Sequence, residues 1–325
     1  MSNYILHHGS CPDGTAAALA AHMKLGDDAQ YLGVNYGKPV PEIPDGSDVW
    51  VLDFSYPAQT LLDLARRMKS VTVLDHHATA QKDLCLDAFL PLIGDPPMGM
   101  DMLLGSVKQD FLSIGNLSIR FDMTKSGAVL AWEHFHPGTE VPMFFRYVQD
   151  RDLWKFELLQ SRQFSAGLRL YPMTIDGYQA AYEDDIGPLT ASGETALEVI
   201  NQAVDAMCKN ARLACFDGKY QSVLLSNFTP HAGLPTAFVE DEQHRWFAPC
   251  ANATVYFSEV GERLLELYPH AQFAAYYFDR ADGKRQWGLR SRPEFDCSVI
   301  ARAWGGGGHL QAAGFTTGNK REEPS

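Results

Sequence analysis

The chain has 325 residues, of which 46% are hydrophobic and 21% charged, and its formal net charge is −13. This length allows two domains of ~100–200 residues each, and the composition is that of an ordinary globular protein with a full core. The acidic balance argues against a general surface for long duplex nucleic acid, although a local cationic pocket for a short anionic ligand is compatible with it.

Nothing in the sequence resembles a membrane span or a leader peptide. No window offers the ~18 uninterrupted apolar residues that a span needs, and the N-terminal residues lack a basic region followed by an apolar one. We therefore expect a cytoplasmic protein without membrane contact. The 6 cysteines are scattered and form no CxxC pair, which is typical of free thiols in a reducing compartment. They are Cys11, Cys85, Cys208, Cys215, Cys250 and Cys297.

The first predicted unit is a strand, a turn and a helix. Residues 4–6 begin the strand, and a helix rich in alanine follows over residues 15–23. The N-terminus of such a helix offers free N–H groups that favour an anion, and Asp13 could simply cap it. Because side chains alternate along a strand, at most one of His7 and His8 faces this carboxylate.

Two further strands end in polar residues. Residues 48–55 form a strand that carries Asp53, a helix spans 61–69, and an apolar run rich in valine over 71–74 leads into three polar residues, Asp75, His76 and His77. The alternation of strands and helices predicts a parallel sheet with right-handed crossovers, so these strand ends share one edge. Imidazole is the commonest metal ligand, and a neighbouring carboxylate can be a ligand or fix its tautomer. By itself, the tripeptide is equally compatible with a polar turn.

The middle of the chain is less regular. Residues 87–116 show no clear period, whereas residues 121–133 and 144–154 look like helices. The second of these helices closes with two acids, of which we expect Asp150 to be a fourth carboxylate in the cleft. The alternative is a surface ion pair with a neighbouring arginine.

Residues 190–213 carry apolar residues at helical spacing, and we place the domain boundary in this helix. Beyond it the pattern predicts strands over 221–227, 253–257, 271–279 and 285–291, and helices over 259–268 and 295–304.

Four glycines at 305–308 precede His309. Because glycines cost backbone entropy on ordering, a plausible reason for the run is a ligand phosphate on the backbone amides, with His309 beside it and Arg290 opposite. The alternative is a flexible loop between the helix before it and an alanine helix at 312–313.

Oxygen ligands mixed with one or two imidazoles suit Mn²⁺ or Mg²⁺ better than structural Zn²⁺. Two ions ~3.5–4 Å apart can clamp the attacking and leaving oxygens of a phosphoryl transfer, with a metal-activated water as nucleophile. We expect Asp53 to be the carboxylate shared between them, and His77 to donate to a substrate oxygen.

These motifs resemble the DHH phosphoesterase superfamily with an attached DHHA1 domain. Asp75-His76-His77 is the naming motif of that superfamily, and residues 305–315 resemble the glycine-rich DHHA1 signature. The first-strand motif and the acids at 53 and 150 follow in the expected order. Within the superfamily, the chain is similar to the oligoribonuclease-like or cyclic-nucleotide-phosphodiesterase-like branch.

The resemblance implies an α/β fold with two lobes: a parallel-sheet DHH domain over residues 1–190, a linker helix over 191–216, a smaller α/β DHHA1 domain over 217–318 and a disordered tail over 319–325. It implies that manganese is held in the first lobe by His8, or alternatively by His7. The other manganese ligands would be Asp13, Asp53, His76 and Asp150. Asp75 would orient His76 or add a ligand, and with His77 it forms the catalytic pair. Substrate would be held in the second lobe by Arg290, Ser291, Gly306, Gly307, Gly308 and His309.

One departure concerns the first motif, where many members carry Asp-x-Asp and this chain has Cys11-Pro12-Asp13. A thiol is a softer ligand, so the site would hold one or two ions, Mn²⁺ or alternatively Mg²⁺. The predicted activity is a phosphodiesterase or exonuclease for short oligonucleotides or related nucleotides. Alternatives are a nucleotide-binding regulatory protein with weakened catalysis and a phosphatase for nucleoside bisphosphates. The sequence leaves open the preferred base, the choice between RNA and DNA, the polarity of cleavage and the pathway. It also leaves open whether the chain forms a homodimer.

Overall fold

The structure is a computed structural model that describes residues 2–93, 104–108, 111–217, 222–225 and 245–318. The chain divides into two compact units, Met1–Leu197 and Glu198–Ser325. The division falls inside helix α10 (Ile186–Cys208), and residues 319–325, the expected disordered tail, lie outside the described part. The predicted fold class, an α/β protein with two lobes, is confirmed.

The first unit is built on a seven-stranded sheet with the order β2-β1-β3-β4-β7-β6-β5. The strands β2, β1, β3, β4 and β7 run parallel, and β6 and β5 add an antiparallel edge. Their bounds are β1 Asn3–His8, β2 Ala29–Val34, β3 Asp48–Leu52, β4 Ser70–Asp75, β5 Leu104–Lys108, β6 Phe111–Ile114 and β7 Leu117–Phe121.

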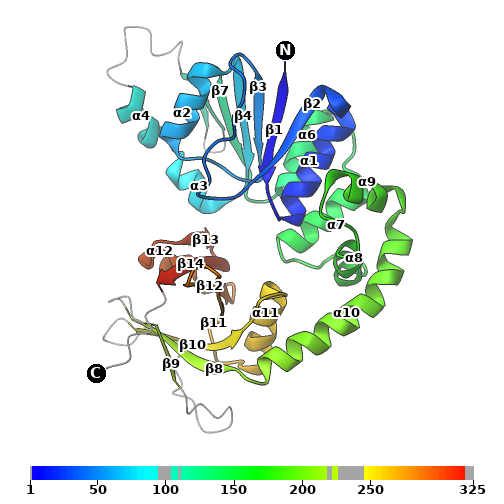
Figure 1. Cartoon of the computed structure of the whole chain (residues 1–325), viewed down its shortest axis with the longest axis vertical. Coiled ribbons are helices and arrows are strands. Elements are labelled where there is room, and N and C mark those ends of the chain that lie inside the picture. Colours follow the sequence, from blue (N-terminus) through cyan, green and yellow to red (C-terminus); the bar gives the residue numbers. More distant parts are fainter. Residues whose placement is uncertain (1, 94–103, 109–110, 218–221, 226–244, 319–325) are drawn as a thin grey trace. The chain divides into compact units, whose positions relative to one another are not determined.

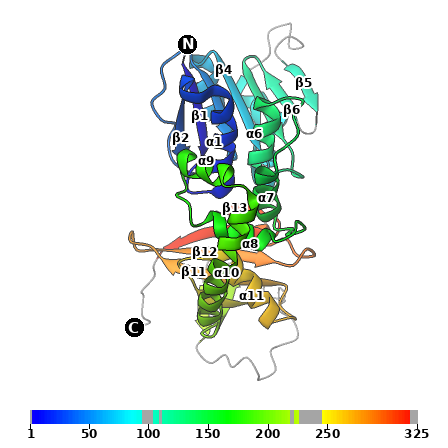
Figure 2. The ribbon, with the colours of Figure 1, turned by 90° about the vertical axis from the view of Figure 1, so that its right-hand side faces the viewer.

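Helices cover both faces of this sheet, with α2 and α4 on one side and α1 and α6 on the other (Figure 1). Figure 2 looks onto the face with α1, α6 and α9. Successive strand residues serve opposite faces: Ile5 packs in the core beneath α1 and α6, and Leu6 in the core beneath α2. This explains why the central strands are apolar throughout rather than alternating.

The helices of the first unit follow the expected signals in most places. Ser126 caps α6 by accepting a hydrogen bond from the N–H of Val129, and the buried alanines of α1 allow α6 to approach closely. The bounds are α1 Pro12–Leu25, a 3₁₀ turn η1 Gly26–Asp28, α2 Ala58–Arg67, α3 Ala78–Asp83, α4 Leu86–Ile93, α6 Gly127–Phe135, α7 Met143–Asp152, α8 Ser161–Leu168 and α9 Ile175–Glu183.

The second unit holds another seven-stranded sheet, with the order β13-β14-β12-β11-β10-β8-β9. Its core is aromatic, with Phe216, Trp287 and Phe315 packed together. The bounds are β8 Arg212–Asp217, β9 Ser222–Leu225, β10 Arg245–Asn252, α11 Phe257–Leu267, β11 Phe273–Asp279, β12 Lys284–Ser291, α12 Ser298–Ala303, β13 Gly307–His309 and β14 Ala312–Gly318.

Two predictions for the second unit are wrong. Residues 253–257 are not a strand, because β10 ends at Asn252 and α11 begins at Phe257. The segment after the glycines is not a helix, because Ala312–Gly318 pairs antiparallel with β12 and with β13. Tertiary pairing therefore overrides the helical preference of alanine there.

Candidate metal centre

Three neighbouring parallel strands bring polar residues to one edge of the first sheet. β1 ends at His8, β4 ends at Asp75, and Asp53 follows directly after β3, which lies between them. Asp53 adopts a left-handed backbone conformation, with φ of 63°, and its N–H donates to the carbonyl oxygen of Leu74 at 2.9 Å. Such a conformation outside glycine is uncommon and clusters at functional sites, so the backbone here is held to aim one carboxylate.

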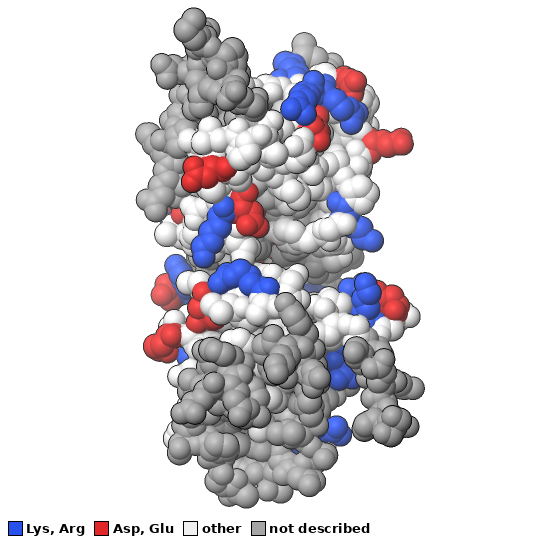
Figure 3. Space-filling model, turned by 90° about the vertical axis from the view of Figure 1, so that its left-hand side faces the viewer, with Lys and Arg blue, Asp and Glu red and all other residues white. Residues whose placement is uncertain are grey.

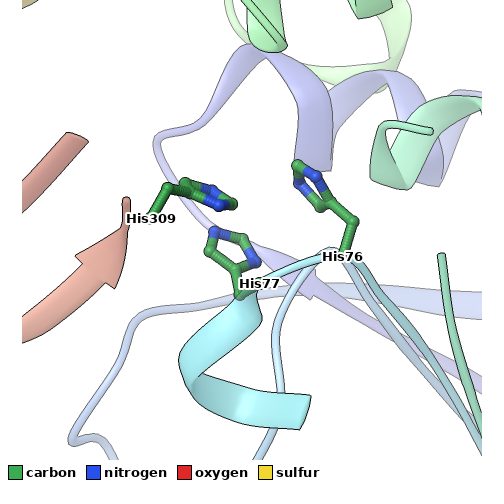
Figure 4. Close-up of side chains that lie close together, drawn as sticks. All are labelled: His76, His77 and His309. Atoms are coloured by element: carbon green, nitrogen blue, oxygen red, sulfur yellow. The ribbon is translucent and has the colours of Figure 1, made fainter. Parts of the chain in front are cut away.

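At the end of β4, Asp75 organises the following residues. This fully buried carboxylate accepts the backbone N–H of His76 at 2.7 Å, the ring Nδ1–H of His77 at 2.6 Å and the hydroxyl of Ser55 at 2.6 Å. Figure 4 shows His77 directly before the short helix α3, with His76 at the strand end. Asp75 therefore holds the backbone of His76 and the ring of His77, whose imidazole meets its Oδ1. That Asp75 orients His76 or is itself a metal ligand stays a prediction.

The ring of His76 is instead the centre of a cluster of carboxylates. Its Nε2 lies 3.1 Å from Oδ1 of Asp53, 3.6 Å from Oδ2 of Asp13 and 3.5 Å from Oδ2 of Asp152. Asp13, Asp53 and His76 are buried and offer ligand atoms within 4.8 Å of one another. We call His76 with Asp13, Asp53 and Asp152 the carboxylate cluster.

Asp13 is fixed by the N-terminus of α6. Its two oxygens accept the backbone N–H groups of Gly127 at 2.6 Å and of Ala128 at 3.0 Å. A helix N-terminus favours an anion, and glycine is required here, because a Cβ on Gly127 would lie 2.5 Å from the Cβ of Asp53. Gly127 therefore positions two carboxylates of the cluster at once.

The structure corrects the choice of the fourth carboxylate. Asp150 was expected in the cluster, but its oxygens accept the backbone N–H groups of Glu157 at 3.0 Å and of Leu158 at 3.1 Å. Asp152 takes the expected place beside His76. Positions two apart on a helix differ by about 200° around its axis, so the two acids at the end of α7 serve different faces.

On the other side of Asp53 lies a second group of three ligand atoms. His8, Cys11 and Asp53 offer them within 4.8 Å of one another, and Nδ1 of His8 is 3.5 Å from Oδ2 of Asp53. We call these three residues the thiol triad. Of the two histidines left open by the sequence, His8 is the one that lies here, while Nδ1 of His7 lies 3.3 Å from the carbonyl oxygen of His8.

The electrostatics of the carboxylate cluster reflect crowded negative charge. Burial and the charges of Asp53 and Asp152 raise the pKa of Asp13 well above its usual value, with His76 offsetting part of this. Burial raises the pKa of Asp152, and Asp53 adds to this against the opposing charge of His76. Burial would raise the pKa of Asp53 too, but the imidazoles of His76 and His8 on either side hold it well below its usual range.

The same charges act on the imidazoles. Burial alone would lower the pKa of His76, but Asp53, Asp152 and Asp13 raise it to about 10. Burial would likewise lower the pKa of His77, but the charge of Asp75 outweighs it and raises that pKa. The carboxylates therefore favour bound protons at the point where they converge. A site that stabilises positive charge, and that offers oxygen and imidazole ligands, fits a divalent cation.

Burial and the charge of Asp53 also raise the pKa of the Cys11 thiol well above its usual value. Its function as a ligand would require loss of that proton, which a bound cation promotes.

Beside the carboxylate cluster lies a cavity of about 110 Å³, within the first unit. This volume is several times the ~10–15 Å³ that one water needs, so a small organic group fits. Asp13 and Asp152 form part of its wall, and Arg151 and Arg169 bring positive charge. The rest is mainly aromatic or apolar, with Tyr147, Phe164, Leu168, Tyr171, Met173 and Tyr178.

The predicted substrate residues of the second unit have local functions in its fold. Arg290 donates to the hydroxyl of Ser258, and the hydroxyl of Ser291 donates to the carbonyl oxygen of Phe295 at 2.6 Å. His309 ends β13 and is also labelled in Figure 4.

Two of the predicted phosphate-binding glycines are required by the hairpin itself. A Cβ on Gly306 would lie 2.1 Å from the carbonyl oxygen of Gly314, and Gly308 has φ of 140° and would place a Cβ 2.4 Å from the carbonyl oxygen of Ala312. The close approach of β13 to β14 thus accounts for these two positions without a ligand, and phosphate binding at the glycines, Gly307 included, stays a prediction.

Charge is mixed on the surface seen in Figure 3, where described Lys and Arg side chains lie among Asp and Glu rather than in one large patch. Within the described residues, no helix combines the length and the apolar character that crossing a membrane requires.

Sequence reasoning missed Asp152, Gly127 and α6 as the anchor of Asp13. The signal for Asp152 was present, since residues 150–152 read Asp-Arg-Asp, but helical phase alone does not say which acid faces the cluster. No local pattern could have paired Asp13 with a helix start 114 positions away.

No protein-family model matches the chain. Uncharacterized protein R106 of Acanthamoeba polyphaga mimivirus is 25% identical over 330 residues, and the match covers 96% of this chain and 66% of that protein. The chain therefore spans just under two thirds of the length of this relative.

Two solved structures are similar to the chain at lower identity. One is described as the pGpG-specific phosphodiesterase PggH of Vibrio cholerae, with 12% identity, a TM-score of 0.40, and coverage of 98% of this chain and 94% of that one. The other is RecJ of Thermus thermophilus in complex with Mn²⁺, with 16% identity, a TM-score of 0.42, and coverage of 97% and 49%.

Proposed function

We propose that this chain is a metal-dependent phosphoesterase of the DHH type, which hydrolyses phosphodiester bonds in short oligonucleotides or related nucleotides. The observation that carries the proposal is the carboxylate cluster, in which three carboxylates converge within 3.6 Å of the ring Nε2 of His76. Three acids around one imidazole repel one another, and a divalent cation relieves that repulsion.

Asp13, Asp53, His76 and Asp152 would hold the ion. Their oxygen and nitrogen donors suit Mn²⁺, with Mg²⁺ as the alternative. When bound, such an ion supplies Lewis-acid polarisation of a phosphoryl group and activation of water.

His77 is placed to contact substrate. Its Nδ1–H donates to Asp75 at 2.6 Å, so Nε2 is the ring atom that would meet a phosphate. Because Asp75 raises the pKa of His77, the ring is more often protonated than a free imidazole and can donate from Nε2 to a phosphate or leaving-group oxygen. Asp75 is then a positioning residue, held in turn by the hydroxyl of Ser55.

The net charge of −13 favours short substrates over long ones. Long nucleic acids gain affinity from many cationic contacts along the backbone, which an acidic chain does not provide. A nucleotide presents only one or two phosphates, and the cavity of about 110 Å³ beside the cluster is of a size for one small group.

The test is product analysis with labelled dinucleotides, longer oligomers, cyclic dinucleotides and phosphoadenosine phosphate, each with Mn²⁺, with Mg²⁺ and after chelation. We expect metal-dependent hydrolysis that is fastest on the shortest linear or cyclic species. Asp53→Asn should abolish it with folding retained, because asparagine tolerates the left-handed backbone at this position.

Asp63→Asn is a matched control, since Asp63 is an exposed acid of α2 that pairs with Arg66. It should leave turnover unchanged. Absence of turnover on the whole panel at saturating metal would overturn the proposal, and retained turnover in Asp53→Asn would remove the cluster from the reaction.

A further inference from the structure

The cavity of about 110 Å³ in the first unit shares part of its wall with the carboxylate cluster. Asp13 and Asp152 belong to both, so an occupant of the cavity lies directly beside any ion that the cluster holds. Elsewhere along the wall, Arg169 and Met173 are exposed, whereas Phe164 is fully buried. The cavity therefore joins the surface of the first unit to the cluster.

The interior of the cavity suits a flat, largely apolar ligand. Tyr147 and Phe164 pack with their ring centroids 4.7 Å apart, and Tyr178 contributes a third ring to the wall. All three residues are buried, with at most 6% of their surface exposed. Aromatic side chains bind the π-face of another ring by stacking, and every nucleobase offers such a face.

Tyr178 also brings a polar group to this apolar wall. The residue is 2% exposed, and its hydroxyl makes no hydrogen bond with any residue that the structure describes. Burial raises the pKa of Tyr178 against the charges of Arg151 and Arg169, so the hydroxyl keeps its proton at neutral pH. An unpaired hydroxyl in a buried place is costly, and a ligand with donors and acceptors at its edge relieves that cost.

The charges around the cavity favour a neutral occupant over an anion. Asp13 and Asp152 present carboxylates to it, and Arg151 already offsets part of the charge of Asp152. A phosphate group inside the cavity, away from the ion, would lose its water and meet these carboxylates. An uncharged ring with a polar edge avoids both costs.

We propose that the cavity is a nucleobase pocket, which takes one uncharged base of the substrate while the adjoining phosphodiester lies at the carboxylate cluster. Only one sugar separates a base from its phosphate, so the wall shared at Asp13 and Asp152 suits the two groups of a single nucleotide. The inference deepens the proposed function and rests on it for the nature of the substrate.

Uncharged nucleosides test the pocket apart from any catalysis. The full chain is stripped of metal with a chelator and mixed with adenosine, guanosine, cytidine or uridine, and saturation-transfer difference NMR identifies the ligand protons that lie against the protein. We expect saturable binding of at least one nucleoside, with stronger saturation of its base protons than of its ribose protons. Inorganic phosphate and ribose 5-phosphate should not displace it.

One pair of variants tests the space in the cavity. Ser165 lines it, so Ser165→Leu places a larger apolar side chain there and should weaken nucleoside binding at least ~10-fold. Ser192→Leu makes the same change at an exposed serine of α10 outside the cavity and should leave binding unchanged. Circular dichroism of both variants verifies that they are folded.

A second pair tests the hydroxyl. Tyr178→Phe should weaken nucleoside binding by about 2–10-fold, the usual range for one hydrogen bond. Tyr182→Phe, one turn further along α9 and outside the cavity, should not. In hydrolysis of dinucleotides with Mn²⁺, Tyr178→Phe should raise KM and leave kcat nearly unchanged, because the contact to the base is the same before and during bond cleavage.

Three results would overturn the inference: no nucleoside binding by the native chain, nucleoside binding that Ser165→Leu leaves unchanged, and displacement of the nucleoside by inorganic phosphate. The proposed function is judged separately, from hydrolysis. Nucleoside binding without hydrolysis of any phosphodiester would support the pocket and refute the proposed function. Hydrolysis without nucleoside binding would refute the pocket alone.

Discussion

The two acids at the end of α7 provide the sharpest test of the site, because a single residue separates them and they have different partners. Asp152→Asn removes the charge 3.5 Å from Nε2 of His76 and touches no backbone hydrogen bond among those described for it. Asp150→Asn leaves the cluster intact and disturbs the loop that follows α7. The two variants have the same size and the same change in charge, so each is the control for the other.

The expected magnitudes follow from these contacts. Partners that only support a metal ligand typically contribute 10–100-fold in affinity, so Asp152→Asn should weaken Mn²⁺ binding by at least about that factor, roughly 1.4–2.8 kcal/mol. Asp150 accepts two backbone N–H groups, and an asparagine would turn its NH₂ toward one of them. Loss of one hydrogen bond to a charged acceptor should cost about 1.5–3 kcal/mol of unfolding free energy.

Calorimetric titration with Mn²⁺ and urea unfolding in the presence of a chelator measure the two effects separately. We expect Asp152→Asn to lose affinity with little loss of stability, and Asp150→Asn to lose stability while the folded protein still binds Mn²⁺. If Asp150→Asn proves the weaker binder and Asp152→Asn the less stable, the assignment of the fourth carboxylate is refuted.

Two further predictions concern Gly127, which lies beside Asp53, and Asp48, which lies at the start of β3. Gly127→Ala would place a Cβ 2.5 Å from that of Asp53, so urea unfolding should show a loss of about 1–3 kcal/mol and titration should show weaker Mn²⁺ binding; unchanged values for both would contradict the close packing. At the start of β3, hydrogen bonds from Lys69 and Ser70 lower the pKa of Asp48, so its contribution to stability is present above the pKa of the unfolded carboxyl and is lost as the pH falls through the lower folded value. Asp48→Asn should therefore be less stable than the native chain at pH 7 by about 0.2–1 kcal/mol, with the gap closing below about pH 4; a gap that persists in acid would exclude this carboxylate as its cause.

The sheet edge was predictable because it depends on order along the chain. Apolar strands separated by helices close into a parallel sheet with right-handed crossovers, so the ends of β1, β3 and β4 had to meet. His8, Asp53 and His76 were named from this rule, and the structure brings their ligand atoms together in two groups that share Asp53.

Rotation about a helix axis was not predictable from the sequence. The choice between Asp150 and Asp152 depends on which face of α7 turns toward His76, and both positions carry the same residue type. The glycine run shows a related difficulty. The entropy cost of glycine predicts that a side chain cannot fit at these positions, but it does not say what stands in the way. The obstacle at Gly306 is the backbone of β14, which pattern alone does not distinguish from a ligand.

By itself, the sequence determined the two-lobed α/β class, the strand ends that carry acids and imidazoles, and the unusual thiol at position 11. These features are local or follow from the order of elements, where hydrophobic period and crossover handedness decide the outcome. Only the tertiary structure decided that Asp13 is held by the start of α6, that Asp75 serves His77, and that Asp152 completes the cluster. Such pairings join residues distant in the chain, and they depend on how helices rotate and pack, which no local pattern encodes.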